Sequence, residues 1–187
     1  MSSKDYKVPP MSWAAIGSRA ARFRQQFGLH TFPEVPVVEL IEQVLDYQLD
    51  MVRFEVGSHH EMGLAEGYTC PTGKFIMLRG DVYEKACAGE GRARFTAAHE
   101  LGHWALHTNV PLARVRRGDG TKPYCLAEPQ ANQFAAQFLM PHLAAPETDG
   151  NLGLVAVIDE PVQVAKLDLV VAFVGPGPEL HFLDLYL

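Results

Sequence analysis

The feature that most constrains this chain is a pair of histidines four residues apart, His99 and His103, with Glu100 directly after the first. They stand in a run, residues 92–107, that contains no proline and a single glycine, so it predicts one continuous helix. Residues four apart on a helix share one face, about 6 Å apart along the axis. Two neutral imidazoles can therefore bind one metal ion, while the carboxylate reaches a water on that ion.

This pattern is typical of hydrolytic zinc sites. Zinc lowers the pKa of a bound water to about 7, and a nearby carboxylate such as Glu100 can take its proton as the water attacks a carbonyl. The alternative is a buried helix whose histidines have only a structural role. Apolar residues surround the two histidines, namely Phe95, Ala98, Leu101, Ala105 and Leu106. Two polar rings on the buried stripe would then each need a hydrogen-bonding partner.

The residues after the histidine pair narrow the class of zinc site. A metzincin would have histidine at position 109 and glycine at position 106, where this chain has Asn109 and Leu106, so that class is excluded. A third ligand must come from elsewhere. A purely structural zinc site with four protein ligands stays open as an alternative, and it would need Cys125, His107 or His142 at the metal.

A second helix, predicted over residues 127–140, supplies a candidate third ligand. Pro129 suits a first helical turn and Pro141 ends the helix. Glu128 and Asn132 lie one turn apart on the same side. Glu128 can therefore bind the metal while Asn132 forms a hydrogen bond with a ligating histidine ring.

Residues 94–103 and 128–141 together resemble the ImmA/IrrE family of bacterial and phage zinc metallopeptidases. The resemblance is specific over roughly residues 67–141, departs at Phe138, where leucine is usual, and does not extend to the C-terminal tail. It implies a small thermolysin-like (gluzincin) site with one Zn²⁺, three ligands and Glu100 as general base. The implied ligands are His99, His103 and Glu128.

The resemblance also implies a substrate class. Members of the family cut helix-turn-helix repressors or antitoxins and so release transcription of stress, phage or mobile-element genes. The leading hypothesis is therefore a zinc endopeptidase acting on such a protein. The alternative is a non-catalytic, zinc-stabilised module that sequesters a repressor or antitoxin, and a module of that kind would not need Glu100.

The predicted fold class is α+β, with a helical core that carries the zinc site and a small antiparallel sheet. A metallopeptidase domain is expected over residues 1–141, with helices within 11–47 and strands within 50–79. Residues 1–10 are expected to form a loose leader. Residues 142–187 are expected to form a C-terminal extension, mainly β, packed on the same domain.

The strand that immediately precedes the zinc-helix segment is predicted to border the active-site cleft as an open edge, pairing with an extended substrate. Its residues are Phe75, Ile76, Met77 and Leu78. A strand that merely closes the sheet is the alternative. Three further residues, Tyr124, His107 and His142, are candidates for an oxyanion or cleft role. His107 lies about 12 Å along the helix from His99, too far to share the ion.

The composition and charge of the chain bear on its partners and its location in the cell. The net charge of -6 argues against direct nucleic-acid binding and suits a basic protein partner such as a repressor. Three widely spaced cysteines, no signal peptide and no apolar run of membrane-spanning length together predict a cytoplasmic protein that does not enter a membrane. The oligomeric state stays open.

Overall fold

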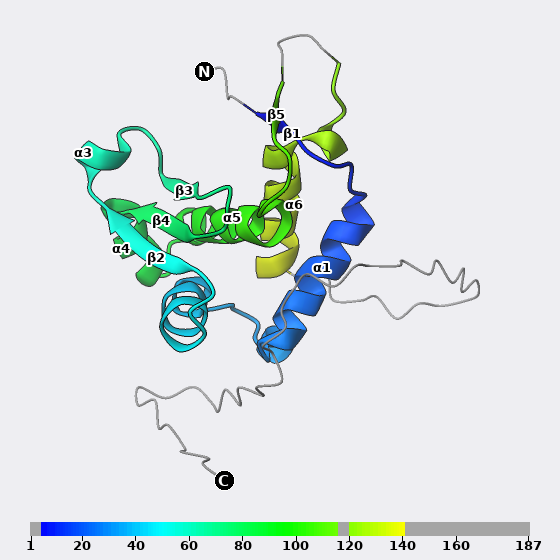
Figure 1. Cartoon of the computed structure of the whole chain (residues 1–187). Coiled ribbons are helices and arrows are strands. Elements are labelled where there is room, and N and C mark those ends of the chain that lie inside the picture. Colours follow the sequence, from blue (N-terminus) through cyan, green and yellow to red (C-terminus); the bar gives the residue numbers. More distant parts are fainter. Residues whose placement is uncertain (1–4, 116–119, 141–187) are drawn as a thin grey trace.

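The structure, a computed structural model, describes residues 5–115 and 120–140, and its helices surround one central helix, α5 (Figure 1). The α+β class is confirmed. The helical elements are α1 (Trp13–Gln26), η1 (Leu29–Thr31), α2 (Val37–Glu39) running on into the π-helical η2 (Leu40–Gln48), α3 (His59–Met62), α4 (Gly80–Cys87), α5 (Gly91–His107), η3 (Pro123–Cys125) and α6 (Ala127–Leu139). The strands are β1 (Tyr6–Lys7), β2 (Arg53–Gly57), β3 (Gly67–Thr69), β4 (Phe75–Arg79) and β5 (Ala113–Arg114).

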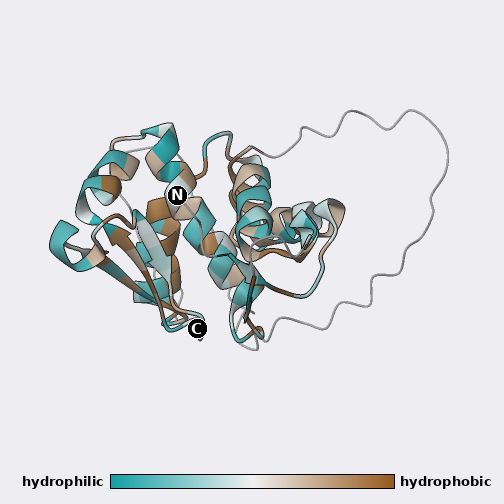
Figure 2. Ribbon diagram, turned by 90° about the horizontal axis from the view of Figure 1, so that it is seen from above, coloured by the Kyte–Doolittle hydropathy of each residue, from teal (hydrophilic) through white to brown (hydrophobic). Residues whose placement is uncertain are grey.

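Helix α5 lies between two layers. The sheet and α4 pack on one side, and α6 packs on the other with α1 behind it (Figure 1). Hydrophobic and hydrophilic residues alternate along the helices, as expected for helices that turn one side to a core (Figure 2). Gly102 lets α5 and α6 approach closely, because a Cβ there would lie 3.1 Å from the Ala131 carbonyl oxygen. The side chains of Phe134 and Phe138 on α6 are fully buried.

The three-stranded sheet corrects two expectations. Its order is β2-β4-β3, with β4 parallel to β2 and antiparallel to β3, so the sheet is mixed rather than antiparallel. The prediction that Phe75, Ile76, Met77 and Leu78 form the open edge was wrong, since β4 is the central strand. Ile76 and Leu78 are fully buried. Alternation in a strand indicates which face is buried but not which strands lie beside it.

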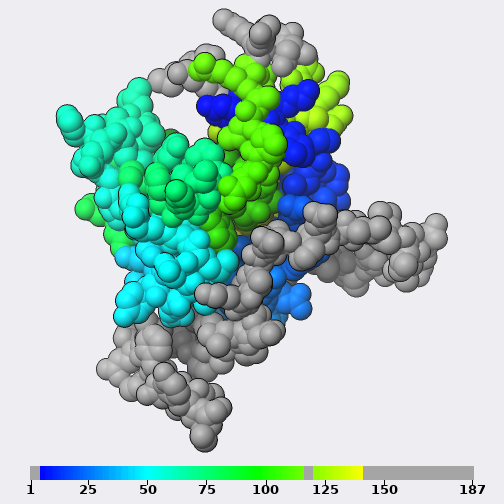
Figure 3. Space-filling view, in the orientation of Figure 1, coloured from blue at the N-terminus to red at the C-terminus, as the bar shows by residue number. Residues whose placement is uncertain are grey.

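The N-terminal residues are held against the later chain, although a loose leader was expected for residues 1–10. Tyr6 pairs with Arg114, and the Val8 N–H donates to the Cys125 carbonyl at 3.0 Å. In Figure 3 the blue N-terminal residues lie against green and yellow-green residues of the second half of the chain. The described segment therefore becomes part of the domain next to α6.

Arg24 is a buried charged residue of α1. It is 2% exposed, and its guanidinium donates to the carbonyl oxygens of Phe138 and Phe32, both at 2.7 Å. Carbonyls in the last turn of a helix have no intrahelical partner, so a guanidinium can satisfy them. Arg24 thereby ties α1 to the end of α6.

Two expectations cannot be compared with this fold. The C-terminal extension 142–187 and His142 lie outside the described residues. Within the described part of the chain, no helix combines the length and the apolar character needed to cross a membrane.

Candidate metal centre

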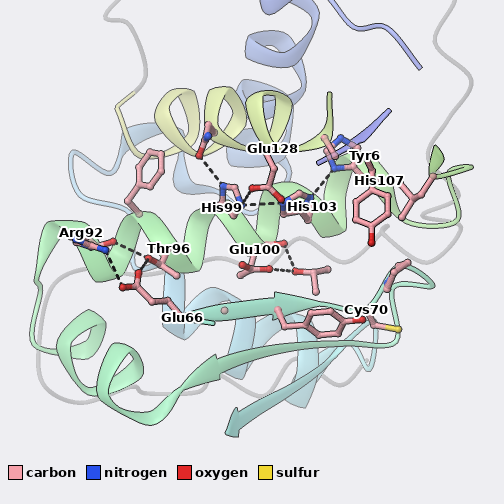
Figure 4. A pocket seen from close by; sticks show the side chains of 18 residues that line it. Tyr6, Glu66, Cys70, Arg92, Thr96, His99, Glu100, His103, His107 and Glu128 are labelled. Atoms are coloured by element: carbon pink, nitrogen blue, oxygen red, sulfur yellow. Dashed lines mark hydrogen bonds and ion pairs between the residues drawn. The ribbon is translucent and has the colours of Figure 1, made fainter. Parts of the chain in front are cut away.

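Three side chains from α5 and α6 converge at one point, with Glu128 reaching from α6 toward His99 and His103 on α5 (Figure 4). The two Nε2 atoms lie 3.0 Å apart. Glu128 Oε2 lies 3.3 Å from His99 Nε2, and Glu128 Oε1 lies 3.6 Å from His103 Nε2. Within residues 5–115 and 120–140, this is the one group of three or more histidine, cysteine, aspartate or glutamate side chains whose ligand atoms lie close enough to hold a metal ion.

The spacing of these atoms fits a zinc ion. A tetrahedral ion with bonds of about 2.0–2.1 Å separates its ligand atoms by about 3.3 Å, and the three measured distances fall on either side of that value. The side chains of His99 and His103 are 15% and 17% exposed and that of Glu128 is 43% exposed, so the group opens on one side. Two nitrogens, one carboxylate and an open position form the donor set of a catalytic zinc site.

Asn132 forms a hydrogen bond with His99, the first candidate ligand. His99 Nδ1 lies 2.9 Å from Asn132 Oδ1. An amide oxygen accepts only, so Nδ1 carries the hydrogen and Nε2 keeps its lone pair. The side chain of Asn132, one turn after Glu128, therefore holds His99 in the tautomer that a metal ion requires.

Glu100 points from α5 toward the sheet and is held by β3 (Figure 4). Its Oε2 accepts a hydrogen bond from Thr69 Oγ1 at 2.7 Å, and the carboxyl is buried, with 7% of the residue exposed. A Cβ at Gly67 would lie 2.6 Å from Glu100 Cγ, so only glycine leaves room for this side chain. Thr69 and Gly67 were not among the candidates from sequence, because neither carries a recognisable signal there.

These groups line a cavity of about 660 Å³ that lies between β3 and the two helices. Strand β3 and the turn after it form one wall, from Gly67 to Pro71. One end of the cavity is polar, with Arg92 donating to Glu66 at 3.0 Å. Tyr6 and Leu112 also line it. The size is that of a substrate cleft.

A model of one protein family, described as the IrrE N-terminal-like domain (Peptidase_M78), matches residues 48–146. The chain belongs to this family. The resemblance to ImmA/IrrE proteins is thereby confirmed, and the family supports a metallopeptidase-type function. No curated protein and no solved structure matched the chain. The matched residues contain the whole metal centre but not α1 or the N-terminal segment.

In this IrrE-like site, the two described oxyanion or cleft candidates differ: His107 lines the cavity, as a cleft residue would, whereas Tyr124 does not. Tyr124 is not among the residues that line the cavity, and its place in η3 leaves the side chain 44% exposed on the surface. His107 lies in the inner wall behind His103, 5% exposed. Burial lowers the pKa of His107 to about 4, so its ring is neutral. This neutral ring faces His103, with 3.1 Å between the two Nδ1 atoms.

The titratable side chains of the candidate metal centre shift one another's pKa. The two neighbouring imidazoles, first that of His103 and then that of His99, hold the pKa of Glu128 well below its usual range. Burial disfavours protonation of His99, but the hydrogen bond with Glu128 and the nearby carboxylates raise its pKa overall. A raised pKa makes protons compete more strongly with a metal ion for His99, so metal affinity is expected to fall as the pH is lowered.

Replacing Gly67 with alanine is expected to reduce activity without removing the metal. The added Cβ would overlap the Glu100 side chain, displacing the carboxylate from its hydrogen bond with Thr69, while the ligands on the far side stay in place. If Glu100 acts as a general base, its displacement would cost up to about 10²–10⁴-fold in rate, and kcat would fall by that factor. Steady-state kinetics and zinc analysis test this. Gly91→Ala is the matched control, because no atom lies within 4 Å of its added Cβ. Full activity of the Gly67 variant would contradict this role.

Proposed function

We propose that this protein is a zinc-dependent endopeptidase that hydrolyses a peptide bond in a protein substrate. The observation that supports it is the convergence of His99, His103 and Glu128 beside the buried Glu100. A zinc ion held by these three residues would supply a water of lowered pKa and would polarise the scissile carbonyl.

Glu100 is the residue that moves the proton. Thr69 occupies Oε2, so Oε1 is left to accept a proton from the attacking water as oxygen bonds to the scissile carbon. The C–N bond then breaks, and Glu100 returns the proton to the leaving nitrogen. Burial raises the pKa of the Glu100 carboxyl, against the effects of Thr69 and the two histidines, and a raised pKa makes the carboxylate a stronger base.

Strand β3 is the element that binds the substrate backbone in this proposal. It lies at the edge of the sheet and lines the cavity beside Glu100. An extended peptide can pair with the free backbone groups of such an edge. Tyr68, the middle residue of β3, is 49% exposed and can contact the substrate. The role expected for Phe75–Leu78 thus passes to Gly67–Thr69.

The proposed substrate is a helix-turn-helix repressor or antitoxin, whose cleavage relieves repression. The resemblance to the ImmA/IrrE family supports this class, and the net charge of -6 suits a basic DNA-binding partner. The rival proposal, a module that sequesters such a partner, uses the same metal ligands. A buried carboxylate beside the metal serves no purpose in a module, and this favours the enzyme.

The test is to incubate the purified protein with candidate helix-turn-helix proteins, beginning with any that is encoded next to it, and to identify products by mass spectrometry. We expect two fragments from one cut, no cleavage after treatment with a zinc chelator, and recovery when stoichiometric zinc is returned. A stoichiometric complex with an intact partner would favour the sequestering module instead.

A further inference from the structure

The far side of the second ligand ring continues into a buried hydrogen-bond chain. His103 Nδ1 lies 3.1 Å from His107 Nδ1, and His107 Nε2 lies 3.1 Å from Gln130 Oε1. His107 is 5% exposed and Gln130 is 1% exposed. Because His107 and Gln130 are shielded from water, their side-chain polar atoms can form hydrogen bonds only with the protein groups that face them.

The orientation of the Gln130 amide determines which group is the donor in each hydrogen bond of this series. Its side-chain nitrogen donates to the backbone carbonyl oxygens of Pro9, at 3.0 Å, and Tyr124, at 2.8 Å. A carbonyl oxygen only accepts, so a flipped amide would set its oxygen against two others. Oε1 therefore faces His107 as an acceptor.

This orientation determines both imidazoles in turn. His107 must carry its hydrogen on Nε2 to donate to Gln130, which leaves a lone pair on His107 Nδ1. His103 must then carry its hydrogen on Nδ1 to donate to His107, which leaves the lone pair on Nε2, the atom beside His99 and Glu128.

We propose that His107 and Gln130 are positioning residues that fix His103 in its metal-binding tautomer, and that the N-terminal segment completes the chain through the carbonyl of Pro9. The inference rests on the proposed function only in placing a metal at His103. The two ligands are thus oriented differently, His99 by the exposed Asn132 and His103 by a buried chain that ends on backbone carbonyls. Pro9 lies outside the residues that the family model matches.

The N-terminal segment is held well enough to serve as this anchor. Besides the contact at Pro9, the Met11 N–H donates to the Tyr124 carbonyl at 3.0 Å, and the Glu128 N–H donates to Asp5 Oδ1 at 3.2 Å. Both carbonyls that accept from Gln130 therefore belong to one hydrogen-bonded unit at the start of α6.

The direct test is ¹⁵N NMR of the histidine rings in the unaltered, full-length protein. We expect the Nε2–H tautomer for His107 both with and without zinc, and the Nδ1–H tautomer for His103 in the zinc-loaded protein. An Nδ1–H tautomer at His107 would overturn the proposal. The measurement needs no cleavage assay, so a protein that binds zinc without cutting a substrate would disprove the proposed function and leave this inference intact.

A variant pair gives a second, independent readout. Gln130→Met keeps the side-chain length but removes the acceptor for His107, and we expect the zinc Kd to rise about 10–100-fold, the usual effect of losing a group that orients a ligand. Gln130→Glu keeps an acceptor for His107, and its second oxygen can donate to the Pro9 or the Tyr124 carbonyl when the carboxyl is protonated, so this variant is expected to recover part of the affinity.

The controls separate orientation from folding. Gln137→Met changes another glutamine of α6, one that lies near Gly17 of α1, and is expected to leave the zinc Kd unchanged. A purely structural Gln130 would lower the Tm of the zinc-free protein equally in both Gln130 variants without altering the Kd, and that result would refute the positioning role.

Discussion

Glu100→Gln is expected to keep one zinc ion bound and to lower kcat by about 10²–10⁴-fold, the typical contribution of a general base. Glutamine has the same shape, and its Oε1 can accept the hydrogen bond from Thr69 that Glu100 Oε2 accepts now. Burial raises the pKa of Glu100, which means that ionisation at neutral pH costs folding free energy. The neutral amide removes that cost, so the Tm should not fall.

The measurement combines zinc analysis, thermal unfolding and cleavage of the identified substrate. Glu84→Gln on the exposed side of α4 is the matched control and should behave like the unaltered protein. Undiminished cleavage by the Glu100 variant would remove it from the mechanism, whereas loss of zinc would show that the residue supports the metal centre.

Glu128→Ala is expected to weaken zinc binding by more than about 100-fold, because even a residue that only orients a ligand contributes about 10–100-fold. It leaves two neutral nitrogens and no anionic ligand. Alanine suits the first turn of α6, so the helix itself should persist. The pKa of His99 should also fall, since the hydrogen bond with Glu128 is the largest influence that raises it.

Competition with a fluorescent chelator measures the zinc Kd, and NMR titration of the histidine rings follows the pKa of His99. Glu84→Ala provides the control for a general loss of negative charge. An unchanged zinc Kd in the Glu128 variant would mean that the third ligand lies elsewhere in the chain, and the assignment of α6 to the metal centre would be wrong.

The sequence alone determined what depends on local geometry. The four-residue spacing of His99 and His103 fixes them on one helical face whatever surrounds that helix. Pro129 and Pro141 limit the second helix in the same local way, so α6 runs from Ala127 to Leu139 within one residue of the predicted 127–140. Gln130 was not among the candidates from sequence, although the structure buries it together with Ala127, Ala131 and Phe134.

Only the tertiary structure decided which elements lie beside one another. The strand order β2-β4-β3 places Gly67–Thr69 at the edge of the sheet, where Phe75–Leu78 had been expected. The sequence could not reveal this, because side chains alternate between the two faces in a central strand and in an edge strand alike. The pairing of His107 with Gln130, and of Gln130 with Pro9, joins residues far apart in sequence. A side chain's periodicity records that it is buried, but its hydrogen-bond partner is chosen by the packing of distant segments, which no local pattern encodes.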